Sequence, residues 1–219
     1  MADRGDDVKI AIFGASGSTG RLLTERCLAA GYTVSALVRT PGTFAYADRV
    51  RIVQGDISSE AAIAETLVGA DAVFSALGAR GLGEDHTLER GIPLIVKAMI
   101  EAHISRIIVL GSAGALDTAM DKQFWWQKWI VEKIVYKTLL KWPVIAQRYQ
   151  YAALAASPLD WTMPMPPMLT NLKGRGKVRV DPDALPPFAA MISREDVADF
   201  MFAQLASKQW SRKAVYISW

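Results

Sequence analysis

The stretch KIAIFGASGSTG, residues 9–20, decides the fold that we expect for this chain. Its first part is an apolar run, typical of a strand that is buried on both faces of a parallel sheet. Glycines follow at positions 14, 17 and 20, and the helix-like pattern TGRLLTERCLAAG (19–31) begins among them. A strand, a glycine-rich turn and a helix in this order favour binding of a dinucleotide at the turn.

Each glycine of this turn has a separate expected role. Gly14 permits the tight turn, Gly17 lets the backbone approach a pyrophosphate, and Gly20 allows the helix to pack closely on the strand. The start of the helix adds free N–H groups and the positive end of the helix dipole. Further hydroxyl donors are available from Ser16, Ser18 and Thr19. The alternative is a glycine-rich turn that binds no ligand.

The same rhythm continues along the chain. Apolar runs recur at 33–39, 49–56, 71–78 and 106–112, and helical patterns lie at 19–31, 58–69 and 91–103. Alternating strands and helices with short connections predict an α/β fold, a single Rossmann-like doubly wound parallel sheet flanked by helices. We expect one NAD(P)-binding domain over residues 1–219. The proline-rich stretches at 163–167 and 181–187 are interpreted as ordered loops.

Composition agrees with one globular domain. The chain has 219 residues, of which 51% are apolar and 21% charged, which excludes a disordered chain or a disulfide scaffold. Cys27 is the single cysteine and only two histidines are present, so we expect no metal site. The sequence has neither an apolar run long enough to span a membrane nor the pattern of a signal peptide, so a cytoplasmic location is expected.

Arg39 indicates which dinucleotide binds. The second apolar run ends in Leu37-Val38-Arg39, and no acid stands beside it to bind the ribose hydroxyl of NAD. A guanidinium suits a 2′-phosphate and can stack on adenine. NADP(H) is therefore favoured over NAD(H), and the alternative is an exposed arginine at the end of a strand.

Other cofactor contacts are expected where the following strands end, because ligands of such sheets lie outside the carboxyl ends of the strands. Asp56 can accept a hydrogen bond from the adenine amine or cap the next helix. After the fourth run, Leu77 and Gly78 can line the ribose and pyrophosphate, and Arg80 adds a phosphate contact. Ser112 follows the fifth run and is expected near the nicotinamide.

These motifs resemble the atypical short-chain dehydrogenase/reductase group with a stand-alone NAD(P)-binding domain, and within it flavin reductase/biliverdin reductase B and its bacterial relatives. The matching segments span nearly the whole chain: KIAIFGASGSTG (9–20), LVR (37–39), VQGD (53–56), SALGAR (75–80), GSAG (111–114), SPLDWTMPMPP (157–167) and ISREDVADFM (192–201). The resemblance implies hydride transfer from NADPH to flavins and sometimes to linear tetrapyrroles.

The resemblance also implies roles for individual residues. The pyrophosphate would be held by Gly14, Ser16, Gly17, Ser18 and Thr19; the 2′-phosphate by Arg39; the adenine by Asp56 and Ile57; the ribose and phosphates by Leu77, Gly78 and Arg80; and the nicotinamide by Ser112, with Pro166 and Pro167 on its other side. Ser112 is also the expected catalytic residue, through its orientation of the carboxamide or the acceptor.

Two departures from the family pattern bear on the acceptor. Met168 follows the two prolines where the family's reductase often has a histidine. The Tyr-Lys pair of ordinary short-chain dehydrogenases is missing, since neither Tyr136, Tyr149 nor Tyr151 has a lysine four residues later. Without this acid, oxidation of simple alcohols is disfavoured, whereas a flavin or quinone stacked on the nicotinamide needs orientation more than an acid.

The segment 115–156 is expected to be helical, and its part at 122–142 is both aromatic and basic. Residues 121–180 carry ten Lys and Arg against three Asp and Glu, although the whole chain has a formal net charge of +3. We weigh three roles for 122–142: a helix covering the sheet, a lid on an acceptor pocket walled by Trp125, Trp126 and Met168, and a contact with a partner protein or membrane surface. No nucleic-acid-binding pattern accompanies these residues.

The sequence therefore favours an NADPH-dependent reductase that transfers hydride to an exchangeable flavin (FMN or riboflavin) or a similar small planar acceptor. Two alternatives remain open. One is a non-catalytic, NADP-binding redox-sensing regulator, like the nitrogen-metabolite repressor relatives of this fold. The other is a reductase or isomerase that acts on a different metabolite. The fold alone does not separate them.

Overall fold

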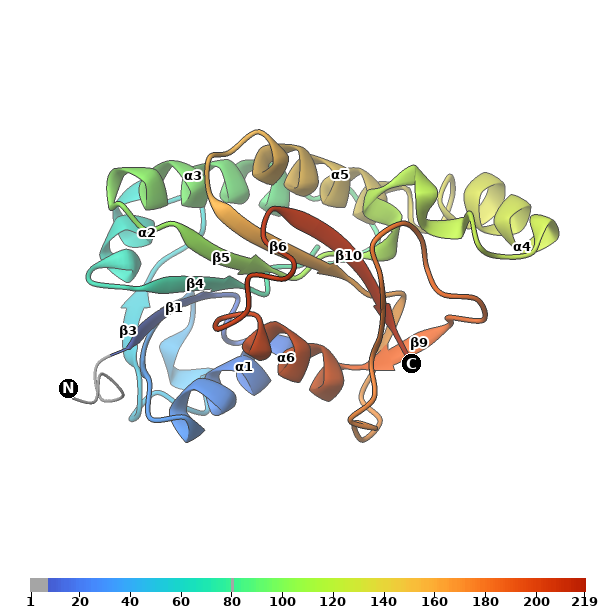
Figure 1. The fold of residues 1–219 in the computed structure, drawn as a ribbon. Coiled ribbons are helices and arrows are strands. Elements are labelled where there is room, and N and C mark those ends of the chain that lie inside the picture. The colour runs from blue at the N-terminus through green and yellow to red at the C-terminus, as the bar shows by residue number, and fades with distance from the viewer. Residues whose placement is uncertain (1–7, 80) are drawn as a thin grey trace.

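The computed structural model describes residues 8–79 and 81–219. Their central feature is an eight-stranded sheet of order β3-β2-β1-β4-β5-β6-β10-β8 (Figure 1). All neighbours are parallel except β10 and β8. The strands are β1 (Lys9–Phe13), β2 (Thr33–Val38), β3 (Arg51–Gln54), β4 (Ala72–Ser75), β5 (Arg106–Val109), β6 (Asp160–Met165), β8 (Arg179–Asp181) and β10 (Lys213–Ser218). A separate parallel pair is formed by β7 (Met168–Thr170) and β9 (Met191–Ser193).

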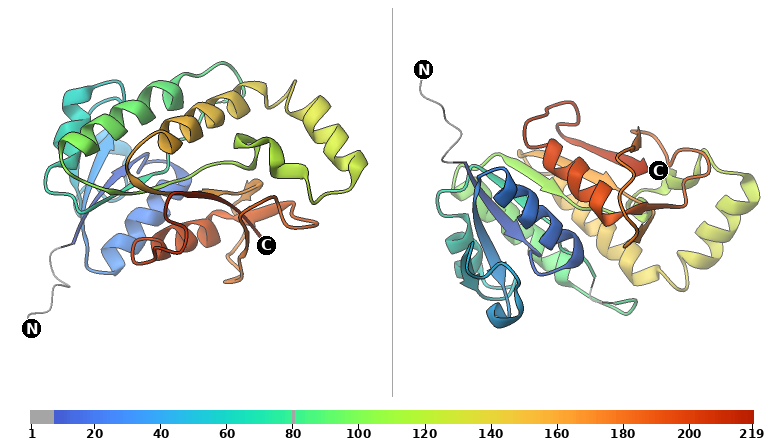
Figure 2. Two further views of the ribbon diagram at one scale, coloured as in Figure 1. Left: turned by 45° about the horizontal axis from the view of Figure 1, so that its top comes forward. Right: turned by 90° about the horizontal axis from the view of Figure 1, so that it is seen from below.

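Helices cover both faces of this sheet. One face carries α1 (Ser18–Ala29) and α6 (Arg194–Ala203), which lie side by side in Figure 2. The other face carries α2 (Glu60–Leu67), α3 (Thr87–Glu101) and α5 (Lys141–Ala155) (Figure 1). The prediction of a Rossmann-like doubly wound sheet is confirmed, although α3 begins four residues earlier than the apolar pattern indicated.

The first strand shows why its sequence folds this way. Successive side chains of a strand point to opposite faces, so a run that is apolar throughout can be buried on both. Ile10 and Ile12 pack into the core beside α1 and α6, while Ala11 and Phe13 pack into the core beside α2 and α3. All four are fully buried.

The proline-rich stretch at 163–167 was expected to be a loop, and that expectation is wrong for its first part. Residues up to Met165 form β6, a central strand between β5 and β10. Pro164 has no N–H to donate, which argued against a central strand. Its carbonyl nevertheless accepts a hydrogen bond from the Gly111 amide at 2.9 Å.

The aromatic-basic segment is helical in pieces. It comprises α4 (Trp125–Ile130), a π-helical turn, Val131–Val135, and the start of α5. Two 3₁₀ turns, Ala113–Ala115 and Asp117–Met120, precede it. The expected single helix over 122–142 is therefore broken. Figure 1 shows α4 projecting beyond the sheet at one end of the molecule. Another 3₁₀ turn, Pro41–Thr43, follows β2. Within the described part of the chain, no helix has both the length and the apolarity to cross a bilayer.

Candidate active site

The glycine-rich turn after β1 folds tightly against its neighbours. Gly14 has a φ of +81°, and a Cβ built there would lie 2.7 Å from the Ala76 carbonyl carbon at the end of β4. A Cβ on Gly20 would lie 2.0 Å from the Gly14 carbonyl oxygen. These two positions therefore require glycine, the first for the turn and the second for the packing of α1 on the strand.

Gly17 differs, because the space beside it is open. A Cβ there would meet one described atom, the Gly14 carbonyl oxygen at 3.3 Å. Gly17 is the N-cap of α1, so the N–H groups of the first turn, including those of Ser18 and Thr19, have no partner inside the helix. An open backbone face beside unpaired donors fits a pyrophosphate. The loop is braced by the Arg21 side chain, whose Nε donates to the Ser16 carbonyl at 3.0 Å.

A cavity of about 170 Å³ opens beside this turn. Its lining comes from the ends of β1, β2, β3 and β4, which lie far apart in the sequence. Eight of the predicted cofactor residues line it: Gly14, Ser16, Gly17, Arg39, Asp56, Ile57, Leu77 and Gly78. Ser18 and Thr19 lie in the first turn of α1 without lining the cavity, and Arg80 lies outside the described residues.

Arg39 directly follows β2 and is exposed, and it lines the first cavity. The buried Leu37 and the half-buried Gly55 line the cavity as well. No ion pair involves Arg39 among residues 8–79 and 81–219. Its guanidinium is thus available to an anion in the cavity, which fits the 2′-phosphate of NADP.

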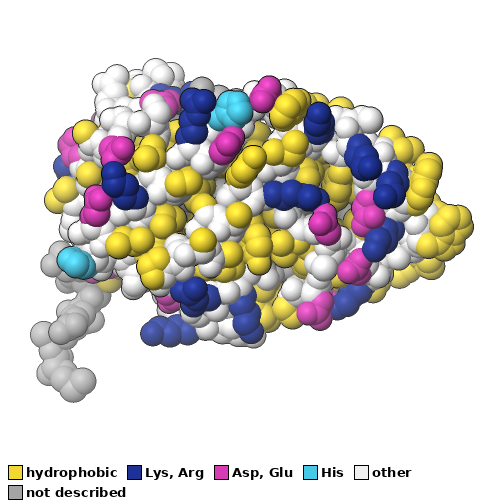
Figure 3. All heavy atoms as spheres, turned by 90° about the horizontal axis from the view of Figure 1, so that it is seen from above, with side chains coloured by type: hydrophobic (Ala, Val, Ile, Leu, Met, Phe, Trp, Pro, Cys, Tyr) yellow, Lys and Arg dark blue, Asp and Glu magenta, His cyan; other side chains and the backbone are white. Residues whose placement is uncertain are grey.

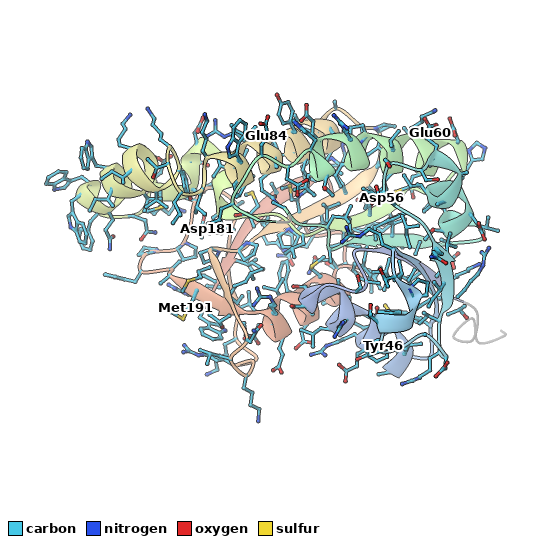
Figure 4. The ribbon with its side chains drawn as sticks, turned by 180° about the vertical axis from the view of Figure 1, so that it is seen from behind. Tyr46, Asp56, Glu60, Glu84, Asp181 and Met191 are labelled. Atoms are coloured by element: carbon cyan, nitrogen blue, oxygen red, sulfur yellow. The ribbon has the colours of Figure 1, made fainter. Side chains whose placement is uncertain are left out.

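Asp56, labelled in Figure 4, lines the same cavity. Its Oδ1 accepts hydrogen bonds from the Ser58 amide at 3.1 Å and the Ser58 hydroxyl at 3.0 Å. The cap of α2 is Ser59, whose hydroxyl accepts from the Ala62 amide at 3.2 Å. Of the two roles considered for Asp56, the helix cap is therefore wrong, because Asp56 instead forms the turn ahead of that cap.

Ser112 and the two prolines are brought together by backbone pairing beyond the ends of β5 and β6. The Ala113 amide donates to the Pro166 carbonyl at 2.9 Å, two residues further along each segment than the bond between Gly111 and Pro164. Ser112 is partly exposed, and its hydroxyl bonds to no other described residue. It is available to a bound group at this edge of the sheet.

A second and wider cavity, of about 1010 Å³, lies at this point. It is bounded by Ser112, Pro167 and Met168, by the segment 120–147, and by the loop at 185–190. Trp126 of α4 lines it, whereas Trp125 does not and is 81% exposed. Most of the lining is apolar, and Arg194 is the one charged side chain among its described members. A flat, largely apolar molecule fits such a space.

One loop connects the two cavities. Residues 76–78, after β4, line the first cavity, and Ala79 and Gly81 line the second. Because Gly78 in the first lining and Ala79 in the second are consecutive residues, the cavities adjoin along the carboxyl edge of the sheet. An extended dinucleotide can therefore have its adenosine half in one cavity and its nicotinamide half in the other.

Sequence reasoning missed two side chains of the second cavity, Tyr136 and Arg194. Tyr136 had been considered only as the start of a Tyr-Lys pair. A Cβ on Gly114 would lie 3.5 Å from the Tyr136 Cζ, so the hydroxyl end of the ring lies near the Ser112 loop. Burial, assisted by Glu132, raises the pKa of Tyr136, which keeps its phenol protonated. Arg194 follows the Ser193 cap of α6, and its position in the cavity depends on the fold of residues 168–194.

Comparison with known proteins gives concordant matches. A family model described as NAD(P)H-binding matches residues 14–208. The UPF0659 protein YMR090W of Saccharomyces cerevisiae is 30% identical over 217 residues, which cover 90% of this chain and 87% of that protein.

Two solved structures share the fold. A short-chain dehydrogenase/reductase from Veillonella parvula DSM 2008 in complex with NADP aligns with a TM-score of 0.78 and 22% identity, covering 97% of this chain and 94% of that one. ChuY, described as an anaerobillin reductase, from Escherichia coli O157:H7 aligns with a TM-score of 0.81 and 19% identity, covering 96% and 97%.

Proposed function

Because this chain belongs to the NAD(P)H-binding family, we propose that it is an NADPH-dependent reductase that transfers a hydride to a planar acceptor, with a flavin as the leading candidate. One observation carries the proposal. A narrow cavity built on the glycine-rich turn adjoins a wide apolar cavity, since residues 76–78 line the first and the next residue, Ala79, lines the second. This is the arrangement needed to hold a dinucleotide beside a second flat molecule.

The preference for NADPH rests on Arg39. Its guanidinium stands at the rim of the first cavity, where the sequence places no acid next to it in the chain. A charge-assisted hydrogen bond to a 2′-phosphate is worth roughly 1.5–3 kcal/mol, enough for about a tenfold preference or more. Gly17 and the start of α1 would hold the pyrophosphate shared by both cofactors.

The chain's contribution to the chemistry is mainly binding and orientation. NADPH, when bound, supplies the hydride. Ser112, with an unpaired hydroxyl beside Pro166, would orient the carboxamide of the nicotinamide or the acceptor. Trp126 and Met168 would wall the acceptor and exclude water. Such a site acts by holding two reactants in contact, and it needs no buried base.

The acceptor's need for a proton separates two classes of substrate. A flavin takes the hydride at a ring nitrogen and can be protonated from water. A linear tetrapyrrole, the class suggested by the name of the ChuY reductase, needs a proton delivered within the pocket. Met168 cannot supply it. The neutral phenol of Tyr136 lines the cavity and can donate a proton. Linear tetrapyrroles are therefore a second candidate class of acceptor.

Arg194 further restricts the class of acceptor that the second cavity would bind. It is the one cation in a mostly apolar lining, as far as the described residues go. Its Nη1 donates to the Asn171 Oδ1 at 2.7 Å, which holds the side chain in place. A positioned guanidinium selects a phosphate or carboxylate. The acceptor is therefore expected to carry an acidic group, as FMN does and riboflavin does not.

A non-catalytic regulator is the alternative function, and one observation favours it. Trp125 and Trp129 are exposed on α4, at the end of the molecule that contains the second cavity. A binding protein that reports on NADP(H) through a partner would present such a surface.

A direct assay separates enzyme from regulator. The purified protein is mixed with NADPH and, in turn, with FMN, riboflavin, a soluble quinone, a linear tetrapyrrole and a secondary alcohol, and the absorbance of the nicotinamide is followed. The proposal expects oxidation with FMN and little or none with the alcohol. Background rates with every planar acceptor, in a protein shown to bind NADPH, would contradict the reductase and favour the regulator.

A further inference from the structure

Aromatic side chains gather at the end of the molecule that α4 forms. Phe124, Trp125 and Trp129 are 55%, 81% and 55% exposed, and Phe188, from the loop before β9, is 76% exposed. The rings of Phe124 and Phe188 meet edge to face with their centroids 5.9 Å apart. These four side chains are called the aromatic tip. Figure 3 shows hydrophobic side chains concentrated at this end of the molecule, with Lys and Arg and some Asp and Glu side chains beside them.

The backbone of Phe188 gives an independent sign that the tip has a role outside the fold. Its φ is +63°, in the left-handed region that residues with a Cβ rarely adopt. Such strain persists where the surrounding structure enforces it, and it occurs preferentially at functional positions. Here the strained residue is not enclosed by the fold: its ring is 76% exposed, contacts Phe124 and borders the second cavity.

Next to the tip lies a row of lysines. Lys133, Lys137 and Lys141 are spaced four residues apart and line one hollow together with Arg148. Among residues 8–79 and 81–219, Lys133 and Lys137 take part in no ion pair, and Lys141 has its Nζ 4.7 Å from the centre of the Trp142 ring. These three lysines are called the basic face. Asp117 and Glu132 line the same hollow, but they pair with Arg148 and Lys128. Five cations therefore stand against two acids among the described lining residues, and the surface keeps an excess of positive charge.

We propose that this end of the molecule docks on a membrane surface that contains anionic lipids. The aromatic tip would enter the interfacial layer of the bilayer, where amphipathic rings such as that of Trp are favoured. The basic face would contact the lipid phosphates, as lysines beside an apolar surface do in helices that lie on membranes. This docking goes beyond the reductase activity and does not depend on it.

The pattern along α4 connects docking to the second cavity. Trp126 and Ile130 line that cavity, whereas Trp125 and Trp129, on an adjacent face of the same short helix, do not. One helix therefore has a side that bounds the acceptor cavity and a side that is free for contact. Docking through Trp125 and Trp129 leaves Trp126 and Ile130 in the cavity lining, whereas Phe188 belongs to both the tip and that lining.

A second copy of the chain is a less suitable occupant of this surface. Two-fold interfaces bring the same patch of both subunits together. Self-association through the tip would therefore bring the basic faces of two copies close to one another, with like charges opposed. A bilayer that contains anionic lipid has the complementary charge.

The experiment is co-sedimentation of the full chain with vesicles of phosphatidylcholine alone or of an equal mixture of phosphatidylcholine and phosphatidylglycerol. Wild-type protein is expected to bind the mixed vesicles, to bind phosphatidylcholine vesicles much more weakly, and to dissociate as salt is raised. The double variant Trp125→Ala/Trp129→Ala should bind at least roughly tenfold more weakly, from loss of apolar insertion. In Lys133→Glu/Lys137→Glu, the affinity for the mixed vesicles should fall by at least roughly fivefold for each substituted position.

Matched controls lie in the loop before β8. Lys173→Glu/Lys177→Glu changes the net charge equally, and Leu172→Ala removes another exposed apolar side chain; both should bind vesicles like the wild type. The NADPH affinity of every variant is measured in parallel to show that it is folded. If wild-type protein fails to bind NADPH, the proposed function is contradicted, whereas the vesicle result still stands by itself.

Three outcomes would overturn the docking proposal. The first is a wild-type chain that does not co-sediment with the mixed vesicles. The second is a tip variant that binds them as well as the controls do. The third is a wild-type dimer in sedimentation velocity that becomes monomeric in Trp125→Ala/Trp129→Ala without any vesicle binding, which would assign the tip to self-association.

Discussion

The two cavities of this site are built in different ways. The first is narrow and formed largely by backbone at the ends of four adjacent strands, with Gly14 and Gly20 in positions where any Cβ would clash. The second is about 1010 Å³ and is formed by side chains of α4, the π-helical turn, α5 and two loops. Figure 4 shows Asp56 of the first cavity on one side of the molecule's middle and Met191, in the strand that pairs with the strand of Met168, on the other.

This difference indicates that the first cavity binds the cofactor and the second binds the acceptor. Backbone amides and glycines fix the position of a cofactor and leave little freedom for variation. An apolar cavity lined by side chains excludes water and accepts a flat molecule, with few groups that select it. Variants in the first region should therefore act on NADPH binding, and variants in the second on the acceptor.

Gly17→Val should have the largest effect, a loss of NADPH affinity of roughly a hundredfold or more. The valine side chain would occupy the open space where the backbone must approach the pyrophosphate. The fold should survive, because a Cβ at this position meets only the Gly14 carbonyl oxygen, at 3.3 Å. Circular dichroism checks the fold and Trp fluorescence measures binding.

Gly20→Val provides the contrast, since its Cβ would lie 2.0 Å from that same oxygen. This variant should fail to fold. A folded Gly17→Val protein that still binds NADPH would contradict the assignment of the loop.

Arg39→Ala should remove a preference for NADPH over NADH that we expect to be roughly tenfold or more. The affinity for NADH should hardly change, because the lost contact is to the 2′-phosphate. Arg49→Ala is the matched control, an exposed arginine before β3 that does not line the cavity. Equal affinities of the wild type for the two cofactors, or the same ratio after Arg39→Ala, would refute this explanation of cofactor choice.

Most of the fold could be predicted because its signal is local. Continuous apolar runs such as 9–13 and the glycines of the first turn specify the parallel sheet and its dinucleotide edge, and both the fold class and the family relationship are confirmed. Strand β6 was missed since Pro164 removes a donor, and the pairing that tolerates it depends on neighbours distant in sequence.

The second cavity could be predicted only in part. Ser112, Met168 and Trp126 were expected there and line it. Tyr136 and Arg194 were not expected, because their positions follow from how α4, α5 and the loops pack and not from a motif. Trp125 and Trp126 are adjacent in sequence, and only the course of α4 decides which of them lines the cavity.

Ser112→Ala should slow NADPH-dependent flavin reduction by roughly tenfold or less, because the hydroxyl orients a bound group without transferring a proton. NADPH affinity should remain near that of the wild type. Steady-state rates at saturating FMN measure the effect. A fall in rate of several orders of magnitude would still support a reductase. It would contradict the orienting role, since it would make Ser112 essential to the chemical step.

Arg194→Ala should have the smallest effect, and its size should depend on the acceptor. The KM for FMN should rise by roughly threefold to tenfold, in line with loss of one partly exposed charge-assisted contact. The KM for riboflavin, which has no phosphate, should stay the same. An equal rise in KM for both flavins would show that Arg194 shapes the cavity without contacting the phosphate of FMN.

The central claim is that the two cavities form one site in which a hydride passes directly from NADPH to a flat acceptor. Anaerobic single-turnover mixing of the protein–NADPH complex with FMN tests it, with the nicotinamide and flavin absorbances recorded together. The account predicts that both bands decay at the same rate and in equal amounts, and that Gly17→Val abolishes both changes. Formation of the NADPH complex with no flavin reduction above the protein-free rate would contradict it.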